Sequence, residues 1–86
     1  MGVVAVTLRI LPDGPEVDIA TLSSEIRRRL GSRVKSLEHR PFAYGLTALI
    51  VIVLIDDAPG GSEAIEAELA ALPGVSSAEA TDVSLV

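Results

Sequence analysis

The sequence predicts a small α+β domain in which two helices cover one face of a four-stranded antiparallel sheet. Its elements follow the order β-α-β-β-α-β. The chain has 86 residues, so we expect one domain over residues 1–86. Hydrophobic residues make up 49% of the chain. They alternate as in strands along some segments and recur every three or four residues along two others.

The first predicted strand covers residues 3–11. Its alternation sends side chains to opposite faces of the sheet, Val4, Val6, Leu8 and Ile10 to one and Val3, Ala5, Thr7 and Arg9 to the other. The Pro-Asp-Gly-Pro sequence at 12–15 ends this strand in a turn. Asp18 can then cap a helix that ends at Gly31. One stripe of this helix is apolar: Ile19, Leu22, Ile26 and Leu30.

The second predicted strand, over residues 33–40, is mostly polar and therefore suits the edge of the sheet. Residues 41–45, Pro-Phe-Ala-Tyr-Gly, form the predicted tip of a hairpin. The third strand, over residues 46–55, is apolar at nearly every position. We therefore expect this strand to lie centrally and to have both faces covered.

A loop is predicted at residues 56–61, and Ser62 is expected to cap the second helix, with Glu63 and Glu66 in its first turn. The buried stripe of this helix comprises Ile65, Leu69 and Leu72. After Pro73-Gly74, the last strand covers residues 75–86, with its apolar content in Ala78, Ala80, Val83 and Leu85. This order is that of the ferredoxin-like βαββαβ plait, whose right-handed crossovers place the first and third strands in the centre.

The net charge is −5, from 12 acidic and 7 basic residues, which disfavours direct binding to nucleic acid. Six of the seven basic residues cluster along the end of the first helix and the second strand: Arg27, Arg28, Arg29, Arg33, Lys35 and Arg40. This positive zone either complements the helix dipole and the edge strand or contacts an acidic partner.

The sequence also bears on where the protein works. The absence of cysteine fits a reducing cytoplasm, and the first ten residues lack the features of a signal peptide. The apolar run at 46–55 has about half the length of a membrane-spanning helix. We therefore expect a cytoplasmic protein without a membrane span.

No motif in the sequence predicts catalysis. The single histidine, His39, lies on the predicted edge strand without an obvious set of partners. Asp56-Asp57 supplies fewer oxygen ligands than a hard cation normally needs. The glycine pair at 60–61 is not followed by the lysine of a phosphate-binding loop. We expect no enzyme activity, no metal and no cofactor.

Two surfaces are candidates for function instead. The face of the sheet opposite the helices is open in such a plait, and an apolar open face either binds a partner or simply contains good strand formers. We expect its apolar members to be Val3 and Ala5 with alternate members of Leu49, Val51 and Val53. The second candidate is the hairpin, which holds both aromatic residues, Phe42 and Tyr44. Aromatic residues are frequent interface anchors, although either ring could instead plug the end of the core.

The segment at 41–49, Pro-Phe-Ala-Tyr-Gly-Leu-Thr-Ala-Leu, resembles the proline-aliphatic-alanine-aromatic-glycine-leucine signature of archaeal elongation factor 1-beta. Further short matches follow in order at Ile10-Leu11-Pro12 with Val17-Asp18, Gly60-Gly61-Ser62-Glu63-Ala64, Gly74-Val75 and Thr81-Asp82-Val83. The resemblance covers essentially the whole chain. It implies a guanine nucleotide exchange factor that promotes GDP release and GTP reloading on the GTPase elongation factor 1-alpha during protein synthesis.

The resemblance also implies a binding site for this GTPase. Its expected members are Phe42, Tyr44, Gly45 and Thr47 of the hairpin, Lys35 and Arg40 of the second strand, and Leu85 near the last residue. Many relatives carry a basic residue where Thr47 stands and one or two basic residues near their last residue, where this chain has Leu85. Exchange activity would then depend on the hairpin and strand surfaces or on Lys35 and Arg40. The alternative function is a small regulatory or assembly module that binds an amino-acid-like ligand or oligomerises through its open sheet face.

Overall fold

The computed structural model describes residues 2–56 and 60–85; Met1, Val86 and the predicted loop residues Asp57, Ala58 and Pro59 lie outside these ranges. Within them, strands and helices follow one another in the predicted order. They are β1 (Val3–Pro12), α1 (Ile19–Leu30), β2 (Val34–Pro41), β3 (Thr47–Asp56), α2 (Gly61–Ala70) and β4 (Val75–Leu85). Short 3₁₀ turns at Gly31–Arg33 and Ala43–Gly45 precede β2 and β3.

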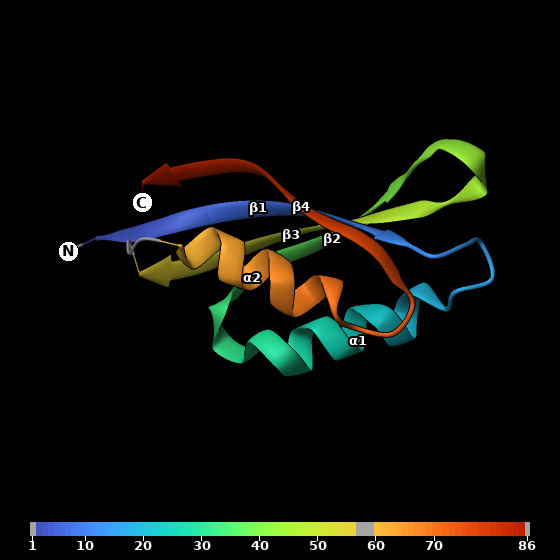
Figure 1. The fold of residues 1–86 in the computed structure, drawn as a ribbon, viewed down its shortest axis with the longest axis horizontal. Coiled ribbons are helices and arrows are strands. Elements are labelled where there is room, and N and C mark those ends of the chain that lie inside the picture. The colour runs from blue at the N-terminus through green and yellow to red at the C-terminus, as the bar shows by residue number, and fades with distance from the viewer. Residues whose placement is uncertain (1, 57–59, 86) are drawn as a thin grey trace.

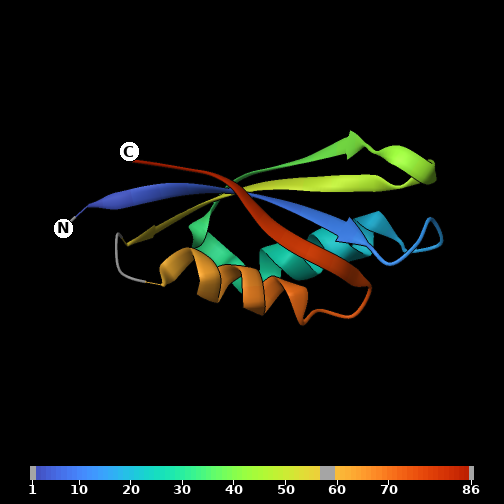
Figure 2. The same ribbon diagram turned by 45° about the horizontal axis from the view of Figure 1, so that its top comes forward.

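The four strands form one antiparallel sheet in the order β2-β3-β1-β4. The two most apolar strands, β1 and β3, are central, which confirms the predicted plait. Both helices lie on one side of the sheet, and the other side is open (Figures 1 and 2). The hairpin between β2 and β3 extends from the end of the molecule opposite the two termini (Figure 1).

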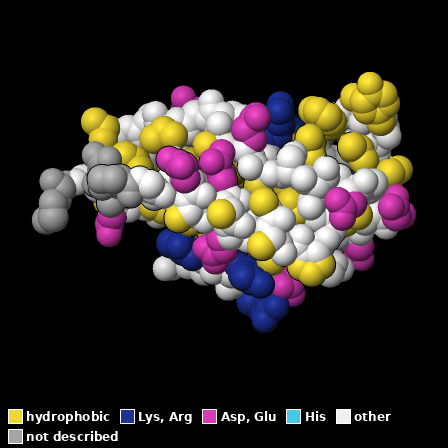
Figure 3. All heavy atoms as spheres, in the orientation of Figure 1, with side chains coloured by type: hydrophobic (Ala, Val, Ile, Leu, Met, Phe, Trp, Pro, Cys, Tyr) yellow, Lys and Arg dark blue, Asp and Glu magenta, His cyan; other side chains and the backbone are white. Residues whose placement is uncertain are grey.

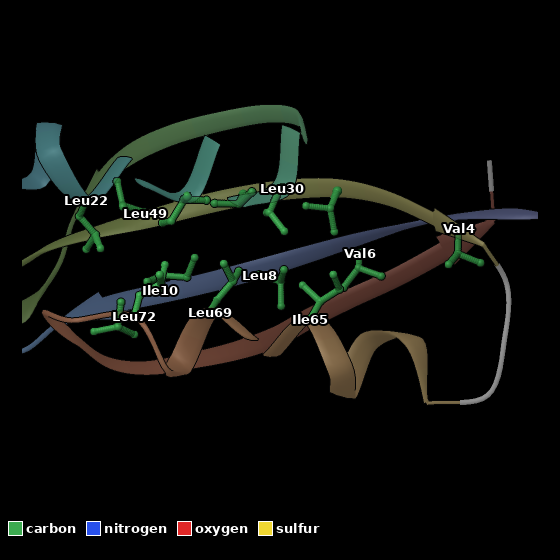
Figure 4. Close-up of a cluster of buried hydrophobic side chains, with 14 residues drawn as sticks. Val4, Val6, Leu8, Ile10, Leu22, Leu30, Leu49, Ile65, Leu69 and Leu72 are labelled. Atoms are coloured by element: carbon green, nitrogen blue, oxygen red, sulfur yellow. The ribbon is translucent and has the colours of Figure 1, made fainter. Parts of the chain in front are cut away.

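The hydrophobic core lies between the sheet and the helices. Alternate residues of β1 point into it, as predicted: Val4, Val6, Leu8 and Ile10. They meet the buried stripes of both helices, made up of Leu22, Ile26 and Leu30 on one side and Ile65, Leu69 and Leu72 on the other (Figure 4). Because these side chains are aliphatic and nearly all of their surface is removed from water, this layer is the main source of stability.

The prediction for the faces of β3 was wrong. Its fully buried residues face the helices, because they pair across the sheet with the core residues of β1: Leu49, Val51 and Val53. The open side carries a different set, which is only partly buried: Ile50, Ile52 and Leu54. The two helices cover only one face of the sheet (Figure 2), so β3 is covered by helices on one face alone.

Asp18 caps α1, as predicted. One oxygen of its carboxylate accepts hydrogen bonds from the backbone N–H groups of Ala20 at 3.0 Å and Thr21 at 3.4 Å. The other oxygen accepts a hydrogen bond from the Thr21 hydroxyl at 3.0 Å. These bonds satisfy donors that the first turn of a helix leaves without intrahelical partners.

The cap should make helix stability depend on pH. The Thr21 hydroxyl, followed by backbone N–H donors, lowers the pKa of Asp18 below its ordinary value. A lowered folded-state pKa means that the charged group stabilises the fold above the unfolded pKa, and that this contribution is lost as pH falls through the folded pKa. Asp18→Asn keeps a capping oxygen but does not ionise. We expect its Tm to fall less than that of the parent chain between about pH 5 and about pH 2.5. Thermal unfolding followed by circular dichroism would show this, and parallel Tm curves would contradict it.

The start of α2 differs from the prediction. Gly60, with a φ of 76°, is the N-cap residue, and the helix begins at Gly61. Ser62 therefore lies inside the first turn, and no side chain among the described residues caps this helix. A glycine before the helix supplies the left-handed conformation that a residue with a side chain rarely adopts.

Glu66 links α2 to the edge strand β4. Its carboxylate accepts a hydrogen bond from the backbone N–H of Ala80 at 2.6 Å. A bulge lies beside this contact, because Thr7 pairs with Asp82 whereas Leu8 pairs with Ala80, so the register skips one residue of β4. Beyond the bulge, the apolar residues Val83 and Leu85 pair with core residues of β1 and stay on the helix side, yet they are 53% and 75% exposed.

Candidate partner-binding site

The hairpin between β2 and β3 is short and well defined. Pro41 pairs with Thr47 at its base. Inside it, the Phe42 N–H donates a hydrogen bond to the Leu46 carbonyl at 2.9 Å, and the Leu46 N–H donates one to the Ala43 carbonyl at 3.2 Å. These bonds join only residues of the hairpin tip itself.

Tyr44, at the hairpin tip, combines an unusual backbone with an exposed ring. Its φ is 64° and its ψ 28°, and it is the only non-glycine residue in the described ranges with a positive φ. Bulky residues rarely adopt this left-handed conformation, and such conformations concentrate at functional sites. The side chain is 91% exposed. The turn therefore holds an aromatic ring out in solvent.

Phe42 is placed quite differently. It is 38% exposed, and its ring lies under the guanidinium group of Arg9 on β1, with the Arg9 Cζ atom 5.5 Å from the ring centroid. Arg9 belongs to the side-chain set that faces the open side of the sheet. Neither aromatic ring joins the core cluster, so the alternative in which one of them plugs the end of the core is wrong.

Charged residues surround this stack. Arg9 donates a hydrogen bond from its guanidinium group to the Glu79 carboxylate on β4 at 3.2 Å. Arg9 and Glu38 both pair with Ile50, one from each side, so Glu38, Arg9 and Glu79 lie in one row across the open face. Arg40 donates to Glu38 at 2.9 Å. The hairpin end of the molecule therefore combines hydrophobic side chains with charges, and Figure 3 shows hydrophobic side chains gathered there beside a basic group.

The structure brings together some of the predicted site residues and separates the others. Five of them lie at or beside the hairpin: Arg40, Phe42, Tyr44, Gly45 and Thr47. Lys35 lies on the edge strand β2, between the residues that pair with Val53 and Ile52 of β3, whereas Leu85 is the last residue of β4, the opposite edge strand, and pairs with Val4. The predicted contacts thus form a hairpin group and two separate positions on opposite edges of the sheet.

Sequence reasoning missed Arg9 and Glu79 as members of the hairpin group. The alternation in β1 did assign Arg9 to the face opposite the core. What it could not give was the register that sets Arg9 beside Glu79 and its guanidinium group over the Phe42 ring.

Half of the positive zone makes contacts inside the molecule: Arg28, Arg33 and Arg40. Arg33 donates hydrogen bonds to the carbonyl groups of Leu30 and Arg29 at the end of α1, at 3.2 and 3.3 Å. Arg28 pairs with Glu25 at 2.6 Å on the same helix. Cations at the end of a helix offset its negative pole. These contacts favour the helix-dipole interpretation of the zone over contact with an acidic partner.

Other parts of the described structure offer less chemistry. A groove of about 430 Å³ lies between the start of α1 and the end of α2, and it is lined by apolar side chains with one hydroxyl and two carboxylates: Val17, Asp18, Thr21, Leu22, Glu25, Leu72 and Pro73. Among residues 2–56 and 60–85, His, Asp and Glu side chains do not gather in threes that could hold a metal ion. Over the same ranges, each helix is too short or too polar to cross a membrane.

Comparison with known proteins identifies the class to which this fold and hairpin belong. Residues 5–86 match the EF-1 guanine nucleotide exchange domain, and the chain belongs to that family. It is similar to elongation factor 1-beta of Methanothermobacter thermautotrophicus, with 42% identity over 85 residues and 96% of each chain covered. It is also similar to elongation factor 1-beta of Methanospirillum hungatei, with 37% identity over 86 residues and 100% of each chain covered. The resemblance seen in the sequence is therefore confirmed.

Proposed function

We propose that the hairpin group is the surface through which this chain promotes GDP release from elongation factor 1-alpha. Guanine nucleotide exchange in translation elongation is the function that membership of the EF-1 exchange domain family gives the chain. An exchange factor works by binding the nucleotide-free GTPase more tightly than the GDP-bound form, because equal affinity for both would shift no equilibrium. The chain therefore needs a contact surface rather than a catalytic set.

The observation that carries the proposal is the presentation of Tyr44. A ring that is 91% exposed, on a backbone held in a rarely used conformation, gains nothing for the fold of the isolated chain. Tyrosine is enriched among residues that dominate binding energy, because it supplies a large apolar surface with little loss of conformational entropy. Burial of this ring in a pocket of the GTPase would account for its placement.

The proposal extends to the other predicted site residues. Gly45, Thr47 and Arg40 adjoin Tyr44 and Phe42, so one contact on the GTPase can cover all of them. Lys35 and Leu85 lie on opposite edges of the sheet, so each would need a separate contact with the partner. Leu85 stands where the resemblance leads us to expect a basic residue near the end of the chain.

The remaining parts of the proposal concern role and location. Residues 1–86 act as a single exchange domain, which is not itself an enzyme and needs no cofactor. The net charge of −5 supports a protein partner rather than direct contact with nucleic acid. Because the proposed partner works in protein synthesis, the proposal includes a cytoplasmic location away from membranes.

Release of a fluorescent GDP analogue from elongation factor 1-alpha tests the proposal. We expect the chain to accelerate release in the presence of excess GTP and to form a complex with the nucleotide-free GTPase on gel filtration. No acceleration together with no complex would overturn the proposal. A rise in Tm on addition of free amino acids, with no effect on GDP release, would instead favour the regulatory-module alternative.

A further inference from the structure

We propose that Arg9 is a positioning residue for the hairpin: held by Glu79, its guanidinium group clamps the Phe42 ring to the open face and so sets the direction in which Tyr44 projects. The functional part of this inference rests on the proposed function, because it takes Tyr44 as the contact with the GTPase. The clamp itself is a property of the isolated chain and can be tested without a partner.

The position of Arg9 suits this role. It lies on β1, a central strand, and pairs with Ile50 of β3 on one side and Glu79 of β4 on the other. Its backbone is thus fixed from both sides. Beyond the last β2–β3 pair, Pro41 with Thr47, the backbone hydrogen bonds of the hairpin tip join only its own residues: Phe42 to Leu46, and Leu46 to Ala43. A contact between Arg9 and Phe42 therefore ties the hairpin to the most firmly held part of the sheet.

The geometry of the three side chains fits a clamp. The Arg9 guanidinium lies over the Phe42 ring at 5.5 Å and donates to the Glu79 carboxylate at 3.2 Å. A cation within about 6 Å of a ring centroid is attracted by the electron density of its face. Glu79 limits the rotation of the guanidinium group, and a planar group can stack on a ring in a way that an ammonium group cannot.

One further detail shows that the side chain is constrained. The Nε atom of Arg9 is buried and has no hydrogen-bond partner among the described residues. Leaving a buried donor unpaired is unfavourable, so other contacts must hold the side chain in this orientation. The stack on Phe42 and the ion pair with Glu79 are the contacts available to do so.

NMR on the free chain can test the contact between Arg9 and Phe42 and its effect on the mobility of the hairpin. In the free chain, we expect the side-chain protons of Arg9 to show upfield NMR shifts from the Phe42 ring, and Phe42→Leu to abolish them. We expect Arg9→Gln to lower the ¹⁵N heteronuclear NOE of the Tyr44 and Gly45 amides, because the hairpin then moves more freely. Unshifted Arg9 protons in the parent chain, or an unchanged NOE in Arg9→Gln, would overturn the clamp.

The exchange reaction tests the consequence for function. We expect Arg9→Gln to raise the concentration needed for half-maximal GDP release about fivefold, with the maximal rate unchanged. Phe42→Leu should have a similar effect, and the double variant should be no worse than either single one, because both break the same contact. Arg9→Lys should remain defective because it keeps the charge but not the planar group. The matched control is Arg28→Gln, which breaks the exposed pair with Glu25 on α1 and should leave release unchanged.

Each outcome has a separate meaning. Additive effects of the two single changes, or full recovery in Arg9→Lys, would overturn the positioning role even if the parent chain is active. A parent chain that does not accelerate GDP release would overturn the proposed function and the role of Arg9 in it. In that case the NMR measurements would still decide whether the clamp exists.

Discussion

Tyr44→Ala should weaken the action of the chain on the GTPase by about 30- to 700-fold, measured as the concentration needed for half-maximal GDP release. This range corresponds to the loss of about 2–4 kcal/mol, which is typical of an aromatic anchor at the centre of an interface. The ring is 91% exposed in the free chain, so its removal takes almost no contact away from the fold. We therefore expect the Tm of Tyr44→Ala to stay close to that of the parent chain.

Tyr44→Phe is the matched control. It keeps the ring and tests the hydroxyl alone, so it should retain most of the activity that Tyr44→Ala loses. Isothermal titration against nucleotide-free GTPase would measure the same difference as binding affinity. A Tm that falls in Tyr44→Ala while binding is unchanged would show that the ring serves the fold of the hairpin and not the partner.

Leu8→Ala should produce the largest loss of stability, about 3 kcal/mol within the usual range of 2–5 kcal/mol for a buried leucine. Leu8 is fully buried on the central strand β1, between the stripes of the two helices (Figure 4). The packed layer around it cannot collapse fully into the space left behind, so the loss includes both the transfer of the side chain and the cavity. Small domains have total stabilities of only about 5–15 kcal/mol, so such a loss is a large fraction.

Urea denaturation of Leu8→Ala and Leu85→Ala would compare the same change at two burial levels. Leu85 is 75% exposed, and its replacement should alter the free energy of unfolding by less than about 0.5 kcal/mol. Equal losses for the two variants would mean that the C-terminal half of β4 packs against the protein in solution. A small loss in Leu8→Ala would contradict the core arrangement.

The sequence was sufficient for the order of the elements because the periodicities were clear. Alternation in β1 assigned its two faces correctly, and the stripe of α1 matched its buried side. The continuous apolar run of β3 carries no such information, since every position could face either side. Only its pairing with β1 sends Leu49 to the helices and Ile50 to the open side.

The candidate site was predictable to the extent that it is local. The hairpin and its exposed Tyr44 follow from one short segment whose residues are typical of a turn. The partner of Phe42 could not be predicted from that segment, because Arg9 is distant in sequence and reaches the ring only through the register of the sheet. The separation of Lys35 and Leu85 from the hairpin and from each other likewise follows from the order of the strands and not from any one motif.

The contact between Glu66 and Ala80 has a consequence for how this protein meets copies of itself. An edge strand with a flat row of free backbone groups is a template onto which another chain can add, the first step toward fibrils. In β4 that row is interrupted at Ala80, where the strand is bulged and the backbone donor is already bound by a carboxylate from α2. A strand adding to β4 would therefore meet a bend and a negative charge in the middle of the edge with which it would pair. The acidic helix that completes the core thus also protects β4 against uncontrolled growth of the sheet.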